Sequence, residues 1–192
     1  YLFLITFAAM VSKSFDINVS AIQPFDSASK KLLIELSTDT VTVILWDRQD
    51  NVPVAIESFH GSHRLSADWE AMVHQSRLLS ISDLETLVVI GYGNMMPVPA
   101  PLYAPHLAAS QLELFFGNST GLFTSGDVLK ELEMVVAWQI PIEEQHFIVN
   151  HFQWVQLKHS VSLLLENHIQ ETEWEGHILI YANETWVVLW EN

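Results

Sequence analysis

Histidine is the residue type in this 192-residue chain best suited to bind a metal ion or to transfer protons, and it occurs nine times. His60 and His63 form a close pair, while His146, His151 and His159 fall in one region. Zinc enzymes place two histidines one helical turn apart and add a carboxylate, as in His-Glu-x-x-His, and the sequence has no such spacing. We therefore interpret His60 and His63 as surface residues of a loop and predict no metal site.

Motifs for nucleophilic catalysis or nucleotide binding are missing as well. The sequence contains neither Gly-x-Ser-x-Gly nor Gly-x-x-x-x-Gly-Lys-Ser/Thr. Gly91-Tyr92-Gly93 starts like a dinucleotide-binding turn but lacks the third glycine, so we interpret it as the exit from a buried strand. The chain has no cysteine, which excludes disulfides, thiolate metal sites and cysteine nucleophiles. These absences favour a protein that is not an enzyme and that uses no cofactor.

The charge balance narrows the class of partner. Eight basic residues stand against 23 acidic ones, which gives a formal net charge of −15. Such a field repels phosphate backbones and anionic lipid surfaces, so nucleic acid and membranes are excluded and another protein is favoured as the partner. The apolar opening YLFLITFAA is shorter than the roughly 20 residues of a membrane span, and no basic residue precedes it as in a signal peptide. We expect a cytoplasmic protein, and both ends of the sequence look cut from a longer chain.

The elements that must position any functional residues begin with three strands, expected at 30–37, 41–47 and 52–60. Their β-branched residues and the polar turns between them are typical of an antiparallel meander. Ser66 is a suitable N-cap for a helix that follows the third strand. The continuous apolar run at 84–91 predicts a strand buried on both faces and parallel to the first one.

The second half of the chain is expected to alternate between loops, helices and strands. The segments are a proline-broken loop at 95–105, a helix starting at Pro105, strands at 132–141 and 146–152, a helix at about 155–170 and a closing hairpin at 177–190. Glycine, serine and threonine between 117 and 126 favour a linker there. The expected division is a partly disordered N-terminal arm at 1–30, a first subdomain at 31–117, a linker at 118–127 and an incomplete second subdomain at 128–192.

Two segments of the chain share one form. Residues 32–47 and 178–192 both contain an apolar strand, a polar turn and an apolar strand that ends in Leu-Trp and an acid. The second turn is two residues shorter, which preserves the side chains that face the core because strand periodicity is two. The likeness fits either a duplicated unit whose second copy is truncated or two unrelated hairpins, since many β-hairpins share this form.

A family resemblance is spread over much of the chain. The segments that carry it are 32–47, 95–118, 134–141, 152–169 and 177–192. In the order of its strands and helices the chain resembles the ribonuclease H-like core of the actin-like ATPase superfamily, an α/β fold. In finer detail it is similar to an uncharacterised bacterial family, domain of unknown function 3822, found mainly in Bacteroidota. The resemblance implies a duplicated actin-like fold, with the second copy truncated here, and no known activity.

Actin-like ATPases hold the phosphates of ATP with two hairpins, each with an aspartate in its first strand and glycines in its turn. In the first matching hairpin Glu35 stands in place of the aspartate, and Ser37, Thr38 and Asp39 form a turn without glycine. In the second hairpin Tyr181 stands where the acid is expected. Because both departures weaken phosphate binding, our preferred hypothesis is a non-catalytic interaction or scaffold module. The alternative is a divergent ATP-binding protein that uses Glu35, Ser37, Thr38 and Asp39 in the cleft between the subdomains.

A ribonuclease H-type nuclease is a further alternative, because it would combine Glu35 with other carboxylates around paired metal ions. Asp39, Asp47 and Glu57 are available in the sequence. However, Asp39 falls in a turn and Asp47 at a strand end, and the negative charge opposes nucleic acid. We interpret these three carboxylates as solvated turn and edge residues.

Overall fold

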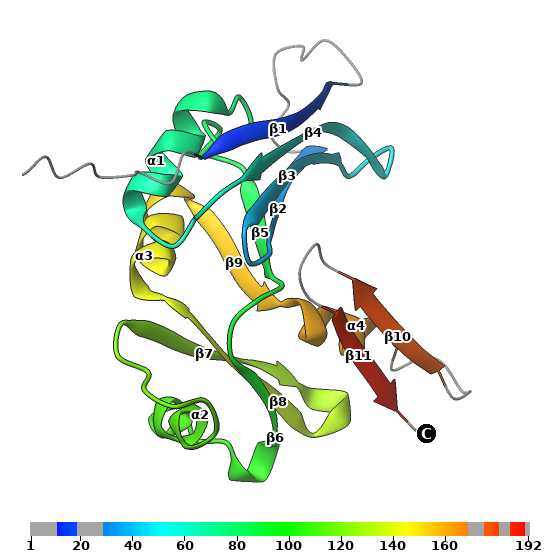
Figure 1. The fold of residues 1–192 in the computed structure, drawn as a ribbon. Coiled ribbons are helices and arrows are strands. Elements are labelled where there is room, and N and C mark those ends of the chain that lie inside the picture. Colours follow the sequence, from blue (N-terminus) through cyan, green and yellow to red (C-terminus); the bar gives the residue numbers. More distant parts are fainter. Residues whose placement is uncertain (1–10, 19–28, 169–174, 181–184, 191–192) are drawn as a thin grey trace, which may run out of the picture.

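The structure is a computed structural model that describes residues 11–18, 29–168, 175–180 and 185–190. Two larger sheets organise most of these residues, one with six strands and one with three. Figure 1 shows the six-stranded sheet in the upper part of the molecule and the three-stranded sheet in the lower part.

The six-stranded sheet has the order β1-β4-β3-β2-β5-β9. Its centre is the predicted antiparallel meander of β2 (Lys30–Leu36), β3 (Thr40–Asp47) and β4 (Val52–His60), which is confirmed. β5 (Glu85–Ile90) lies parallel to β2, as predicted, and β9 (Trp154–His159) lies parallel to β5. The three parallel strands therefore end at the same edge of the sheet.

One face of this sheet is covered by α1 (Ser66–Gln75) and α3 (Ile142–His151) (Figure 1). Alternate residues of the central strands point toward these helices and are fully buried, as Ile34 is in β2. Trp69 of α1 stacks against Phe147 of α3, with the ring centroids 5.3 Å apart. Burying one large apolar side chain contributes about 1.5–3 kcal/mol, so this face forms the main core of the protein.

An insertion between β5 and α3 forms the lower part of the molecule (Figure 1). Its sheet has the order β6-β8-β7 and consists of β6 (Met95–Pro99), β7 (Leu122–Leu129) and β8 (Met134–Pro141). The helix α2 (Ala108–Phe116) packs against β7 and β8. Two short 3-10 helices, Ala100–Leu102 and Lys130–Leu132, complete the insertion.

After β9 the chain continues through α4 (Ser160–His168) to β10 (Glu175–Ile180) and β11 (Thr185–Trp190). These two strands pair in antiparallel fashion, as predicted for the closing hairpin. The turn between them, which contains Tyr181, lies outside the described residues. In the described part of the chain, no helix combines the length and the apolar composition that a membrane crossing needs.

Two elements after β8 differ from the predictions. Residues 146–152, predicted as a strand, belong mostly to α3, because a short apolar run fits a strand and a helix equally well. Pro141 directly before α3 and two glutamates in its first turn are helix-start signals that override the strand pattern. The helix predicted at about 155–170 begins only at Ser160, since the residues before it form β9.

Two segments expected to be irregular are strands. Part of the expected N-terminal arm forms β1 (Ser12–Asn18), which pairs antiparallel with β4. Residues 95–99, expected in a loop, form β6 although they include Pro97 and Pro99. β6 is an edge strand, where the missing amide of proline does not interrupt the ladder.

The expected linker at 118–127 is also more ordered than its composition indicates. Its second half belongs to β7, which pairs with β8 along its whole length. In addition, β9 belongs to the six-stranded sheet, so this sheet combines residues from both sides of the expected boundary at 117. Sheet pairing over this distance leaves no local mark in the sequence.

Candidate functional site

The three parallel strands of the large sheet end together. Leu36 of β2, Ile90 of β5 and His159 of β9 are paired in register at their carboxyl ends. In open sheets of this kind, ligands bind where the carboxyl ends of parallel strands meet. We call this region, with the turn after β2 and the start of α4, the carboxyl edge.

The turn after β2 contains Ser37, Thr38 and Asp39, three of the predicted site residues. The backbone amide of Ser37 donates to the carbonyl of Thr40 at 2.9 Å, and the amide of Gly61 donates to the carbonyl of Asp39 at 2.9 Å. Among the described residues, those with positive φ all lie outside this turn. The turn is therefore closed by the Ser37 amide and lacks the left-handed residues that commonly shape a phosphate-binding loop.

Glu35, the fourth predicted residue, lies within β2 rather than in the turn. Its side chain points to the sheet face opposite Ile34 and Leu36 and is half-buried. Burial raises the pKa of the Glu35 carboxyl above its ordinary value. A carboxyl with a raised pKa is a weaker ligand for Mg²⁺, because the metal must displace the proton.

The carboxylates required by the nuclease alternative are not brought together. Glu57 points into the main core, where Lys13 contacts it at 2.7 Å, on the face of the sheet opposite Glu35. Asp47 lies beside Lys30 at the far end of the same strands. Within the described ranges, no three histidine, aspartate or glutamate side chains are arranged to hold a metal ion.

A fully buried polar cluster lies directly behind the turn. Nδ1 of His63 is 2.6 Å from Oε1 of Glu144, and Nε2 of His63 is 2.5 Å from the carbonyl oxygen of Ser37. The Tyr92 hydroxyl donates to Oε2 of the same carboxylate. His63 and Glu144 are both 0% exposed. The cluster therefore connects the turn after β2, the loop before α1, the exit of β5 and α3.

The protonation state of this cluster follows from its geometry. Nε2 of His63 must carry a hydrogen, because the Ser37 carbonyl can only accept. Burial lowers the pKa of His63, but the Glu144 carboxylate and the Ser37 carbonyl together raise it by more, so its pKa lies above the ordinary value. Burial and Glu144 also raise the pKa of Tyr92, which stays protonated. Both ring nitrogens of His63 and the Tyr92 hydroxyl therefore have hydrogen-bond partners, and the His63–Ser37 bond holds the turn after β2 in place.

Sequence reasoning missed this cluster and misplaced His63. The prediction that His63 is a surface residue is wrong, because its side chain is completely buried. Its partner Glu144 is 81 residues away in the chain, and such a contact has no local pattern. One signal was present in α3, where Glu144 lies one turn before the buried Ile148 and so on the buried stripe.

The start of α4 completes the carboxyl edge, and a side chain from the insertion occupies it. Oδ2 of Asp127, in β7, accepts from the amide of His159 at 2.8 Å and from the hydroxyl of Ser162 at 2.6 Å. The amide of Val161 donates to Nδ1 of His159 at 3.2 Å. Burial lowers the pKa of His159 to about 4, so its ring is neutral. The N-terminus of α4, which favours anions, therefore already has a carboxylate of the same chain beside it.

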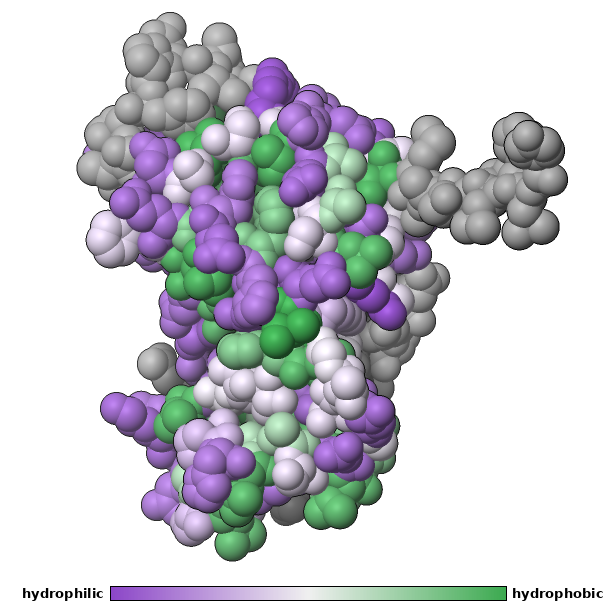
Figure 2. Space-filling view, turned by 90° about the vertical axis from the view of Figure 1, so that its left-hand side faces the viewer, coloured by the Kyte–Doolittle hydropathy of each residue, from purple (hydrophilic) through white to green (hydrophobic). Residues whose placement is uncertain are grey.

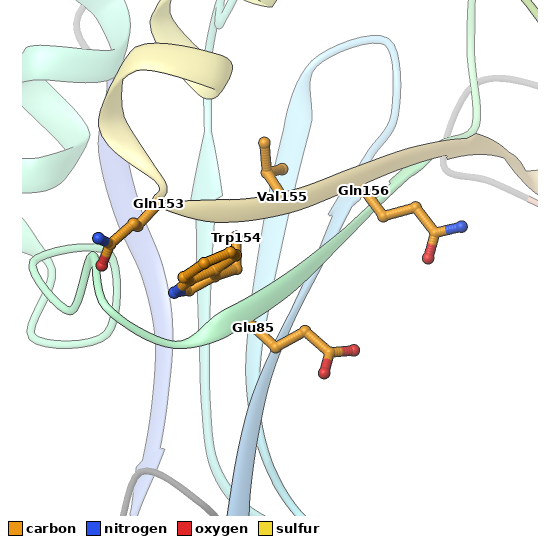
Figure 3. A pocket seen from close by; sticks show the side chains of 5 residues that line it. All are labelled: Glu85, Gln153, Trp154, Val155 and Gln156. Carbon is orange, nitrogen blue, oxygen red and sulfur yellow. The ribbon is translucent and has the colours of Figure 1, made fainter.

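A cavity of about 490 Å³ lies away from this edge, at the amino ends of β5 and β9. It is lined by Glu85, Gln153, Trp154, Val155 and Gln156. Figure 3 shows Trp154 and Glu85 on the same side of the two strands, with Val155 on the other side. This cavity therefore does not coincide with the turn or with α4.

The arrangement of the large sheet defines the class of the protein. An antiparallel meander extended by two parallel strands and covered by helices is an α/β architecture of the actin-like ATPase fold. The crystal structure of a protein from Bacteroides thetaiotaomicron VPI-5482, with an actin-like ATPase fold and unknown function, is similar to this chain with a TM-score of 0.75. The similarity covers 88% of this chain and 69% of that chain at 15% sequence identity. The predicted fold is confirmed, whereas the internal duplication stays a prediction.

The chain belongs to the family described as protein of unknown function (DUF3822), whose model matches residues 20–189. This is the family that the sequence segments indicate, so the predicted membership is confirmed. No curated protein matches the sequence. The side chains of the carboxyl edge are therefore the basis for proposing a function.

Proposed function

We propose that this protein is a non-catalytic interaction or scaffold module that keeps the actin-like fold and binds another protein. The observation that carries the proposal is the Asp127 carboxylate at the N-terminus of α4. A helix N-terminus at this edge of a sheet is a ready site for a phosphate group. Here the Asp127 carboxylate already lies beside this N-terminus, where it accepts from the amide of His159, the residue before α4, and from the Ser162 hydroxyl, so a phosphate would meet a negative charge.

Two further features support the absence of a phosphate site. The amide of Ser37 is used within the Ser37–Thr40 turn, and the turn contains no residue with positive φ. The formal charge of −15 also disfavours a nucleotide, which carries several negative charges of its own.

The proposed setting is the cytoplasm, in keeping with a chain that contains no cysteine. The proposed partner is a protein rather than nucleic acid or a membrane, because the acidic chain repels both. No cofactor forms part of the proposal.

A thermal-shift titration with ATP or ADP and Mg²⁺ tests the proposal. A nucleotide present at about 100 times its Kd would stabilise the native protein by about 2.7 kcal/mol. For a protein of this size such a gain raises the Tm by roughly 5–11 °C. We expect a shift below about 1 °C at millimolar nucleotide, because the carboxyl edge is filled by the protein's own groups.

The alternative function makes a distinct prediction in the same assay. A Mg²⁺-dependent rise in Tm that disappears in Glu35→Ala would replace our proposal by nucleotide binding through Glu35, Ser37, Thr38 and Asp39. Glu113→Ala is the matched control, because Glu113 is an exposed carboxylate on α2, away from the carboxyl edge. This control should leave any nucleotide response unchanged.

A further inference from the structure

The six-stranded sheet has a second face, opposite α1 and α3, which we call the open face. Figure 2 looks onto the side of α1 and α3, where hydrophilic side chains lie over much of the upper part of the molecule. On the other side of the sheet, Figure 1 shows none of the described helices except α4, which borders the sheet at the end of β9. Parallel strands normally have helices on both faces, so β2, β5 and β9 present a face that usually has a cover.

One unbroken row of apolar side chains crosses the open face. Strand pairing places these residues side by side in register, from β1 through β4, β3 and β2 to β5, and we call them the apolar row: Ile17, Ile56, Ile44, Leu33 and Leu87. Residues paired in register share a face of the sheet, on strands about 4.8 Å apart. All five are at least partly exposed, and Ile17 is 42% exposed. The apolar row is therefore one continuous surface, fixed by backbone pairing.

A carboxylate without a partner lies beside the apolar row. Glu35 is the next residue after Leu33 on the open face of β2, with Thr42 and Val89 opposite it on the two neighbouring strands. Its side chain is half-buried, and it has no hydrogen-bond or ion-pair partner among the described residues. Burial alone raises the pKa of Glu35, whereas a cation placed beside it would lower that pKa.

The lysines on the open face are already paired with carboxylates. Lys31 lies 3.1 Å from Glu85, and Lys158 lies 2.6 Å from Glu166 of α4. Glu35 therefore decides the charge that an occupant of this face must supply, because covering a carboxylate without giving it a partner is costly. The net charge of −15 favours a basic occupant as well.

We propose that the open face docks a basic amphipathic helix of a partner protein, with the apolar side of that helix on the apolar row and an arginine or lysine against Glu35. A helix fits this place because α1 and α3 already cover the opposite face of the same sheet, and helices are the usual cover of parallel strands. The basic residue supplies the ion pair that Glu35 lacks. This inference rests on the proposed interaction function and names the surface and the partner chemistry that the function would use.

A synthetic peptide is the probe for this surface. It contains about 18 residues of leucine, alanine and lysine, with the leucines at helical spacing along one side. Titrated into the isotope-labelled full chain and followed by NMR, it should shift the backbone amides of the apolar row and of Glu35. The amides of α2, in the insertion, should not move. A second peptide with glutamate in place of every lysine should cause no shift up to about 1 mM, because it would bring like charge to Glu35.

Two pairs of variants separate docking from general attraction between a basic peptide and an acidic protein. Glu35→Gln should weaken binding of the basic peptide about tenfold. Glu113→Gln removes the same charge from the exposed side of α2 and should change binding less than about twofold. Ile44→Thr should weaken binding at least about fourfold, the effect of one buried methyl group, whereas Val128→Thr on β7 should leave it unchanged. The spectrum of each variant before the peptide is added shows whether it is folded.

Four results would overturn the inference: no response to the basic peptide up to about 1 mM, amide shifts spread over the whole surface, tight binding of the acidic peptide, or equal weakening by Glu35→Gln and Glu113→Gln. Shifts of the apolar-row amides with protein concentration alone would overturn it in favour of a second copy of the chain. None of these results touches the proposed absence of nucleotide binding, which the thermal-shift titration measures separately. A nucleotide response in that titration would refute the proposed function whatever the peptide does.

Discussion

Replacing Glu144 with alanine is expected to destabilise the protein more than any nearby surface substitution. The Glu144 carboxylate accepts from Tyr92 and is 2.6 Å from Nδ1 of His63. His63 is 0% exposed and Tyr92 is 4% exposed, so water cannot replace the lost acceptor without opening the core. The change leaves a buried imidazole and a buried phenol without their shared partner.

The magnitude follows from the burial of the pair. Removing one partner of a buried ion pair costs about 3–5 kcal/mol, because the other charge remains buried. In a protein of this size each kcal/mol corresponds to about 2–4 °C, so the Tm should fall by roughly 6–20 °C. Glu143→Ala is the matched control, since Glu143 occupies the same first turn of α3 but is exposed. This control should cost less than about 1 kcal/mol.

Thermal and urea unfolding of four proteins measure the effect: the unmodified chain, Glu144→Ala, His63→Ala and the double variant. Each single variant leaves the other group unpaired, so the double variant should cost less than the sum of the two. The expected coupling free energy is at least about 1 kcal/mol. The proposed stabilising role of the His63–Glu144 contact would be refuted by two losses of free energy that simply add in the double variant. It would also be refuted by a Glu144→Ala protein as stable as Glu143→Ala.

Three further predictions concern the carboxyl edge and its connections. Asp127→Ala should lower the free energy of unfolding by about 1–3 kcal/mol, measured by urea unfolding, because the buried His159 amide and Ser162 hydroxyl lose their shared acceptor. An unchanged urea midpoint would contradict this role of Asp127. Gly93→Ala should lower the free energy of unfolding by about 1–3 kcal/mol in the same assay, because φ of Gly93 is +88° and an added Cβ would lie 2.6 Å from the Gln139 carbonyl oxygen. An unchanged free energy of unfolding would contradict this argument, because it would mean that the turn relaxes around the added Cβ. Burial lowers the pKa of His159 to about 4. Between about pH 6.5 and pH 4 the unfolded chain therefore binds a proton at this residue that the folded chain does not. The free energy of unfolding should fall as the pH falls through this window. NMR titration of the imidazole checks that pKa, and a value near 6.5 would contradict the burial argument.

The part of the fold that could be predicted is the part set by local patterns. The meander at β2, β3 and β4 follows from alternation and turn residues, and β5 follows from one continuous apolar run. α3 was predicted as a strand in its second half, because a short apolar run has no decisive period. The placement of β9 beside β5 depends on pairing across a whole insertion, which no local window contains.

In the candidate site, too, the local features could be predicted from the sequence and the long-range contacts could not. Ser37, Thr38 and Asp39 are neighbours in the chain, so their shared turn could be predicted from turn chemistry. The contacts that close this region could not, because Glu144 and Asp127 come from α3 and β7, far from their partners in sequence. Long-range polar contacts of this kind have no period and no motif.

The two chain segments that cross between the large sheet and the insertion lie side by side. The amide of Gln139 donates to the carbonyl of Asn94 at 2.9 Å, so the chain enters and leaves the insertion at adjacent points. An insertion whose ends meet in this way can change in length without altering the strands that flank it. We expect members of the family to vary most in length between Asn94 and Gln139, so that different members would present different surfaces on the same sheet.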